Sequence, residues 1–244
     1  MISLLKQFLK KFVKIKLTPK KVFLTDHYQR INQRRQEHLA SLGLKLSGLT
    51  VLEVGAGIGD HTGFFLDRGC QITSTDAREE NLNLLRSRHP NVTVKRLNMD
   101  QPDHALNDVF DMVYCYGLLY HLRHPAEAIQ FMARHCRNML LLETCVSFND
   151  GDAVNSSFET SENPAFSFSG HCCRPTRKWV QRELKRHFEF VYLPLTQPNH
   201  VEFPADWVTP PSGPHLTRSI FIASREKLIN PLLTEEIPRV QTKH

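Results

Sequence analysis

The strongest candidates for chemistry in this sequence are a glycine-rich turn and an acidic residue that follows it. Glycines occupy every second position from Gly55 to Gly59, directly after the run Val-Leu-Glu-Val at 51–54. Glycine allows a backbone to turn tightly and to approach a ligand closely. Asp76 lies 21 positions after Gly55, near the roughly 20-residue spacing at which a carboxylate accepts hydrogen bonds from the ribose of a nucleoside cofactor. The residues expected to contact this cofactor are Gly55, Ala56, Gly57, Asp76 and Ala77.

A parallel sheet covered by helices is expected to position these residues. Short β-branched runs alternate with longer amphipathic segments, and the last two strands are separated by a loop, which makes the last strand antiparallel. The sequence therefore predicts an α/β, Rossmann-like fold with a seven-stranded, mostly parallel sheet, an antiparallel last strand and helices on both faces. Strands are expected at 50–54, 71–75, 92–96, 110–114, 139–143, 188–193 and 216–224, and helices at 60–68, 79–88, 125–136 and 176–187.

Length and composition are those of one globular domain. The 244 residues are 41% hydrophobic and 23% charged, enough for one α/β core. We expect a helical N-terminal segment at 1–47, the main domain at 48–230 with insertions near 145–175 and 195–215, and a tail at 231–244. The six cysteines show no paired framework spacing, and no apolar run approaches the roughly 18 residues of a membrane span. A cytoplasmic protein is expected.

The N-terminal segment carries much of the net charge of +6, since seven lysines precede the first acidic residue, Asp26. Apolar residues recur among these lysines at helical spacing. Such a helix either packs its apolar stripe on the domain or makes peripheral contact with the inner membrane surface through residues 1–21. Nucleic-acid binding is not expected, because the lysines lack interleaved aromatic residues and a recognisable binding module.

One further feature argues against a dinucleotide as the cofactor, and two more contribute to a family resemblance. Glu53 stands two places before the glycine turn, where a carboxylate would not help a loop that binds an anionic pyrophosphate. Met99 and Asp100 follow the third expected strand, and the segment 110–122 continues from a strand into a turn. With these motifs, residues 48–144 resemble class I S-adenosylmethionine (SAM)-dependent methyltransferases.

The resemblance implies a SAM site whose reaction product is S-adenosylhomocysteine (SAH). It implies that Asp100 accepts from the adenine amino group beside Met99, that Glu53 lies near the cationic groups of the cofactor, and that Tyr116 is a further cofactor contact. A plain strand-to-helix turn with Asp76 as a helix cap is one alternative. An NAD-dependent oxidoreductase is another, but the Tyr-x-x-x-Lys pair expected of such an enzyme is absent.

His121 is the candidate catalytic residue. An oxygen nucleophile has to lose its proton near pH 7, a histidine has a suitable pKa, and His121 follows the fourth strand in the turn expected nearest the donor methyl. The alternative is a histidine that only shapes this loop. No metal site is expected, because the adjacent cysteines at 172–173 do not match zinc-ligand spacing. Candidate contacts to the methyl acceptor are Tyr120, His171, Arg174, His200 and Trp207.

The nature of the acceptor is suggested by the run Gly-Leu-Leu-Tyr-His at 117–121, by Glu143 and by Arg174. These residues are similar to the tRNA wobble-uridine carboxymethyl transferase family and to bacterial methyltransferases that act on sugars or other small metabolites. Because fewer than 50 residues precede the first strand, we expect O-methylation of a small molecule, saccharide or glycan. A tRNA-modifying enzyme and a non-catalytic SAM-binding protein remain as alternatives.

Overall fold

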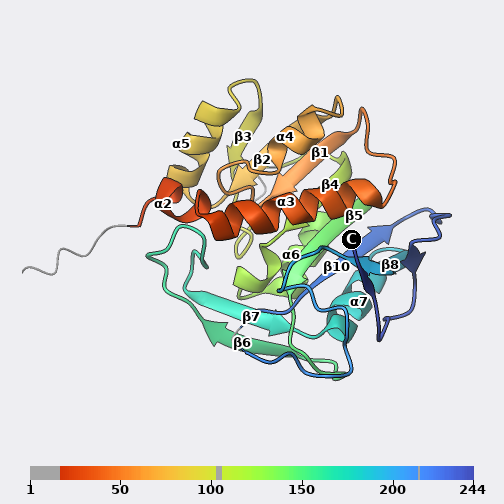
Figure 1. Cartoon of the computed structure of the whole chain (residues 1–244). Helices are drawn as coiled ribbons and strands as arrows, with labels where there is room; N and C mark the ends of the chain where they lie inside the picture. The colour runs from red at the N-terminus through yellow and green to blue at the C-terminus, as the bar shows by residue number, and fades with distance from the viewer. Residues whose placement is uncertain (1–16, 103–105, 214) are drawn as a thin grey trace, which may run out of the picture.

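The computed structural model describes residues 17–102, 106–213 and 215–244, and an eight-stranded sheet forms its centre (Figure 1). Across the sheet the strand order is β11-β8-β10-β5-β4-β1-β2-β3. In chain order these strands are β1 (Thr50–Val54), β2 (Gln71–Asp76), β3 (Thr93–Arg96), β4 (Phe110–Tyr116), β5 (Cys136–Cys145), β8 (Phe190–Pro194), β10 (Arg218–Ser224) and β11 (Leu233–Thr234).

The sheet is parallel from β3 to β5, and β10 runs antiparallel to both of its neighbours, β5 and β8. A loop without a helix joins β8 to β10, so the chain returns in the opposite direction. Residues of β1 and β4 are buried almost throughout, as expected for strands covered on both faces. The predicted Rossmann-like fold is confirmed, with β11 as an edge strand that the sequence analysis did not predict.

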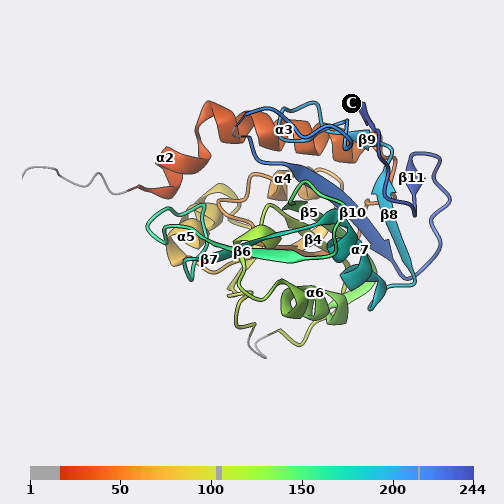
Figure 2. The same cartoon turned by 90° about the horizontal axis from the view of Figure 1, so that it is seen from below.

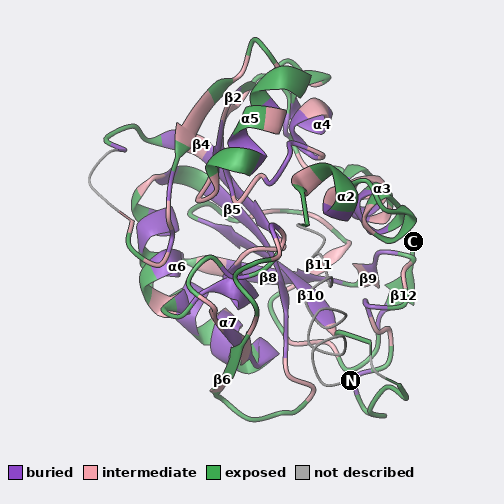
Figure 3. Ribbon diagram, turned by 90° about the vertical axis from the view of Figure 1, so that its left-hand side faces the viewer, coloured by how far each residue is buried: buried purple, intermediate pink, exposed green. Residues whose placement is uncertain are grey.

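Helices cover both faces of the sheet (Figure 2). On one face, α3 (Asp26–Ser41) and α4 (Thr62–Leu66) pack Leu39 and Phe65 against the strands. On the other, α6 (Pro125–Arg134) and α7 (Arg177–Lys185) supply Ile129 and Val180. The remaining helices are α2 (Pro19–Phe23) and α5 (Glu79–Arg88). Figure 3 shows the buried strands between helices whose outer surfaces are exposed.

The N-terminal part of the chain contributes to this core. Ile31 and Leu39 of α3 are each 1% exposed, so α3 packs on the domain. The predicted membrane contact of residues 1–21 falls mainly on residues 1–16, which lie outside the described part of the chain, and it stays a prediction. Within the described ranges, no helix has the length and apolar character needed to cross a membrane.

Both insertions and the tail contain strands where loops were expected. In the first insertion, β6 (Val154–Phe158) and β7 (His171–Pro175) form an antiparallel pair. In the second, β9 (Thr196–Gln197) pairs with β12 (Thr242–Lys243) of the tail. Most of β6 is exposed, so it lacks the alternation of apolar residues from which a strand is predicted. The 12 residues between β6 and β7, 159–170, are called the roof below.

Candidate functional site

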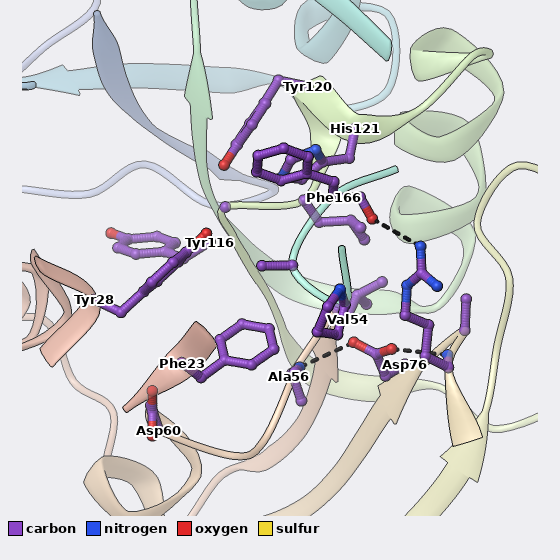
Figure 4. Close-up of a pocket in the computed structure, with 18 of the residues that line it drawn as sticks. Phe23, Tyr28, Val54, Ala56, Asp60, Asp76, Tyr116, Tyr120, His121 and Phe166 are labelled. Atoms are coloured by element: carbon purple, nitrogen blue, oxygen red, sulfur yellow. Dashed lines mark hydrogen bonds between the residues drawn. The ribbon is translucent and has the colours of Figure 1, made fainter. Parts of the chain in front are cut away.

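A cavity of about 530 Å³ lies at the carboxyl ends of β1, β2 and β4, under the roof (Figure 4). Its volume is within the range of small-molecule sites. This is the edge of the sheet at which ligands of such folds are expected. The predicted site residues that line it are Glu53, Gly55, Ala56, Gly57, Asp76, Ala77, Met99, Asp100, Tyr116, Tyr120, His121 and Arg174.

The glycine turn has a backbone that favours glycine. Gly55 and Gly57 have φ angles of +71° and +56°, in the left-handed region where a side chain is strained. A Cβ atom on Gly55 would lie 2.8 Å from Cβ of Leu118. The amide of Ala56 donates to the Thr75 carbonyl at 2.8 Å. The turn is therefore held against β2, with bare backbone facing the cavity.

Asp76 ends β2 beside this turn. Its carboxylate accepts from the backbone amides of Gly57 and Arg78, at 3.0 and 2.9 Å, and from the side-chain amide of Asn81 at 3.1 Å. Burial raises the pKa of Asp76 to about 6. A carboxylate offers about four lone-pair directions, so capacity remains for the ribose hydroxyl of a nucleoside. This geometry fits the predicted cofactor.

Glu53 lies beneath the turn and is 2% exposed. It accepts hydrogen bonds from the hydroxyls of Thr62 and Ser74, at 2.6 and 2.7 Å. Burial raises its pKa to about 7, because both partners are neutral and do not compensate its charge. A cationic group bound in the cavity would favour the ionised form. Glu53 therefore suits a cofactor that carries positive charge.

Met99 and Asp100 line the same end of the cavity, but the carboxylate of Asp100 already has protein partners. One oxygen accepts from the backbone amide of Arg123 at 2.6 Å, and the other accepts from the hydroxyl of Ser169 in the roof at 2.8 Å. Asp100 therefore joins the turn after β4 to the roof. Its contact to adenine stays a prediction.

The roof is fixed over the cofactor half of the cavity by polar contacts. The guanidinium of Arg78 donates to the Ser167 carbonyl at 3.1 Å. The side-chain amide of Asn81 donates both to Asp76 and to the Pro164 carbonyl, each at 3.1 Å. A single amide therefore connects the predicted ribose-binding acid to the roof.

His121 forms a carboxylate–imidazole pair that the sequence analysis did not predict. It ends the short helix η1 (Leu119–His121), and its Nδ1 lies 2.5 Å from Oε2 of Glu159 in the roof. Burial lowers the pKa of His121, while Glu159 acts in the opposite direction. Burial alone would raise the pKa of Glu159, but the hydrogen bond from His121, and the charge of this ring when it is protonated, hold it at about 2. With Nδ1 engaged, Nε2 is the ring nitrogen left for a ligand.

Glu159 also contacts Arg174, whose guanidinium donates to it at 3.3 Å and lies over the ring of Tyr120, 5.0 Å from its centroid. These residues come from three separate segments. No local pattern marks Glu159, which stands in a polar stretch without periodicity, so sequence reasoning had no signal for it.

Buried charges line the far end of the cavity, and the two arginines among them were not predicted. Arg35 of α3 and Arg218 of β10 both donate to Glu143, at 2.6 and 3.1 Å. Arg218 also donates to Glu202 at 2.5 Å and to the Tyr120 hydroxyl at 3.2 Å. The sequence signal for such buried charges is a charged residue next to an apolar run, as Arg218 is before Ser-Ile-Phe-Ile-Ala.

Three predicted acceptor contacts are not brought to this cavity. His171 packs on Phe158, with ring centroids 5.1 Å apart. Trp207 stacks on Phe148 and donates its indole N–H to Gln241 at 2.7 Å. His200 lies in a separate surface hollow beside Asn199 and Val201. The insertion that carries Trp207 and His200 pairs with the chain's tail, and this pairing directs both side chains away from the cavity. No group of three or more histidine, cysteine or acidic residues in the described ranges is placed to hold a metal ion.

Comparisons with known proteins identify the family. A family model described as "Methyltransferase domain" matches residues 24–192, which is more than half of the chain. No curated protein matches this chain.

Solved structures share the fold. The N-terminal domain of EvdMO1 in the presence of SAH and D-fucose is 23% identical, over 82% of this chain and 84% of that chain, with a TM-score of 0.59. Magnesium protoporphyrin IX methyltransferase (ChlM) from Synechocystis PCC 6803 with bound SAH is 15% identical over 82% and 84%, with a TM-score of 0.53. The glycopeptide N-methyltransferase MtfA is 17% identical over 79% and 89%, with a TM-score of 0.51.

The family match spans the glycine turn, Asp76 and His121, and the cavity lies at the edge of the sheet where the fold predicts a ligand. The chain therefore belongs to the methyltransferase domain family and is a class I SAM-dependent methyltransferase.

Proposed function

We propose that this protein transfers a methyl group from SAM to a hydroxyl oxygen of a small molecule, such as a saccharide or glycan unit, with His121 as the general base. The observation that carries the proposal is the contact between Nδ1 of His121 and Glu159 at 2.5 Å, in the same cavity as the glycine turn and Asp76. An acceptor hydroxyl needs such a base near neutral pH.

The cofactor half of the cavity is assigned to residues of the turn and of β2. Asp76 would accept from the ribose, Met99 would pack on the adenine, and the backbone of Gly55 to Gly57 would follow the methionine moiety. Glu53 would offset its positive charge. When bound, SAM supplies an electrophilic methyl group on a sulfonium, so the protein has to position the acceptor behind that methyl and manage one proton.

That proton is assigned to Nε2 of His121. Glu159 holds Nδ1, which fixes the tautomer and ring orientation and stabilises the imidazolium after proton transfer, as carboxylates do in related pairs. Burial lowers the pKa of His121, so the ring is neutral and able to accept a proton at pH 7. Glu159 is a positioning residue, since it acts through His121.

A small acceptor is favoured by the enclosure of the cavity. The roof closes over the reaction centre, and Phe166 stacks on the His121 ring at 6.1 Å. The D-fucose present with the EvdMO1 domain belongs to that protein, and it makes saccharides the first acceptors to test here.

The test combines binding and turnover on the full chain. SAM, SAH and NAD are titrated by calorimetry, and transfer of a labelled methyl group is then followed with panels of hydroxylated acceptors. We expect binding of SAM and SAH but not of NAD. His121→Asn should lower kcat by roughly 10²-fold or more, with unchanged SAH affinity.

His124→Asn is the matched control, because His124 is 45% exposed and should leave turnover unchanged. Near-normal turnover of His121→Asn would remove the base assignment. SAM binding without transfer to any acceptor would support the non-catalytic alternative.

A further inference from the structure

The end of the cavity away from the glycine turn is built from buried charges that methyl transfer itself does not use. We call it the acceptor subsite and define it as Tyr28, Arg35, Tyr116, Tyr120, Glu202 and Arg218, all of which line the cavity. In Figure 4, Tyr28, Tyr116 and Tyr120 lie on the side of the cavity away from Asp76.

The charges of this subsite form one continuous chain of ion pairs. It runs from Arg35 through Glu143, which is fully buried behind the cavity wall, to Arg218 and Glu202. Each N···O distance in it is between 2.5 and 3.1 Å. The chain of pairs joins α3, β5, β10 and the second insertion, so the subsite is held from four parts of the fold.

This arrangement compensates every charge before an acceptor arrives. Two guanidinium groups face two carboxylates, and Arg218 directs N–H groups to Glu143, Glu202 and Tyr120. An anionic acceptor would have to displace a carboxylate, and a cationic one would meet the guanidinium of Arg218. Either would leave a buried charge without a partner, which is costly. The subsite therefore disfavours charged acceptors.

Hydrogen-bonding capacity nevertheless remains. Nε of Arg35 and the hydroxyl of Tyr116 are themselves buried, and neither has a hydrogen-bond partner within the described residues. The hydroxyl of Tyr28 stays protonated, because burial raises its pKa. The hydroxyl groups of an acceptor both donate and accept hydrogen bonds, so they match a wall in which tyrosine hydroxyls lie beside guanidinium and carboxylate groups.

We infer that the acceptor subsite binds an uncharged polyhydroxylated ring, a neutral saccharide unit, and selects it against acidic and amino sugars. This inference rests on the proposed function, because it names the acceptor of that reaction. Arg35, Arg218 and Glu202 set the preference, and Tyr28 supplies a flat wall of the subsite.

The experiment measures binding of sugars to the full chain saturated with SAH. Saturation-transfer NMR compares methyl glycosides of neutral hexoses and deoxyhexoses with the corresponding uronic acids and 2-amino sugars. A neutral glycoside should bind at least about 10-fold more tightly than its acidic and amino counterparts. Comparable binding of a charged form, or no binding of any neutral glycoside, overturns the inference.

A charge-changing variant tests the cause of the preference. Glu202→Gln leaves Arg218 with one carboxylate fewer, so the ratio of uronate to neutral binding should rise by at least about 10-fold, while SAH affinity reports that the fold is intact. Glu226→Gln is the matched control, because Glu226 is exposed, and it should leave the ratio unchanged. An unchanged ratio in Glu202→Gln overturns the assignment.

These outcomes separate the two proposals. Binding of a neutral glycoside without methylation would refute the proposed reaction and leave the subsite assignment standing. Methylation of a charged or aromatic acceptor, with no neutral sugar bound, would refute the subsite assignment and leave the proposed methyl transfer standing.

Discussion

Substitution of Glu53 by glutamine removes a buried negative charge and keeps the size of the side chain. Among the described residues, the carboxylate has only hydroxyl partners, those of Thr62 and Ser74. Burial raises its pKa from the usual 4.5 to about 7. At about 1.4 kcal/mol per pKa unit, the difference between these two pKa values corresponds to about 3 kcal/mol of unfolding free energy.

Linkage determines the sign of the effect. Because the folded-state pKa is higher than the unfolded-state value, the stability contributed by Glu53 is fully present below pH 4.5 and is lost as the pH rises through about 7. Relative to Glu53→Gln, the cofactor-free wild-type protein should therefore lose about 3 kcal/mol between pH 4 and roughly pH 8.5.

Urea unfolding of the cofactor-free protein at a series of pH values measures this difference. Glu37→Gln is the control, since Glu37 is 39% exposed and pairs with Arg34 at the surface, where such pairs contribute at most about 1 kcal/mol. If the curves of wild type and Glu53→Gln run parallel across the whole pH range, the charge of Glu53 is compensated and the reasoning fails. The same variant should bind SAM more weakly, because the carboxylate no longer offsets the cationic cofactor.

Two further predictions concern the proposed site. Asp76→Ala should weaken SAM binding by roughly 10²-fold, because hydrogen bonds to a charged group contribute about 1.5–3 kcal/mol each. Calorimetry measures this loss, with the surface variant Asp67→Ala as the control. Equal SAM affinities of Asp76→Ala and the wild type would exclude the ribose contact. Because burial lowers the pKa of His121, kcat/KM should rise with pH along a limb below pH 6.5 and then stay level. Glu159→Gln removes a group that raises this pKa and should move the limb to lower pH, whereas an unmoved limb would mean that His121 is not the titrating base.

The fold and the cofactor half could be predicted because their signals are local. β1 spans Thr50–Val54 and β2 begins at Gln71, as predicted, since apolar periodicity marks buried strands and the glycine turn marks where β1 ends. Gly55 and Asp76 then meet because adjacent parallel strands end at the same edge of the sheet. Short edge strands such as β11 leave little periodic signal in two residues.

The acceptor half could not be predicted in the same way. Arg35, Glu143 and Arg218 meet from segments 108 and 75 residues apart, and Glu159 reaches His121 only because the first insertion folds back as a β-hairpin. Long-range pairings of this kind depend on packing and not on periodicity. His200 and Trp207 show the converse, since both were expected to contact the acceptor, but the pairing of their insertion with the tail holds them outside the cavity.

The position of β10 has a consequence for the order in which the protein folds. β10 lies between β5 and β8, both of which precede it in the chain, so a nascent sheet has to keep those two edges open until β10 inserts. Open strand edges invite pairing with other chains. Because Arg218 arrives with β10, a chain halted before this step would possess the glycine turn and Asp76 but lack the centre of the acceptor subsite. Capacity to hold the cofactor is thus expected to mature before capacity to select an acceptor.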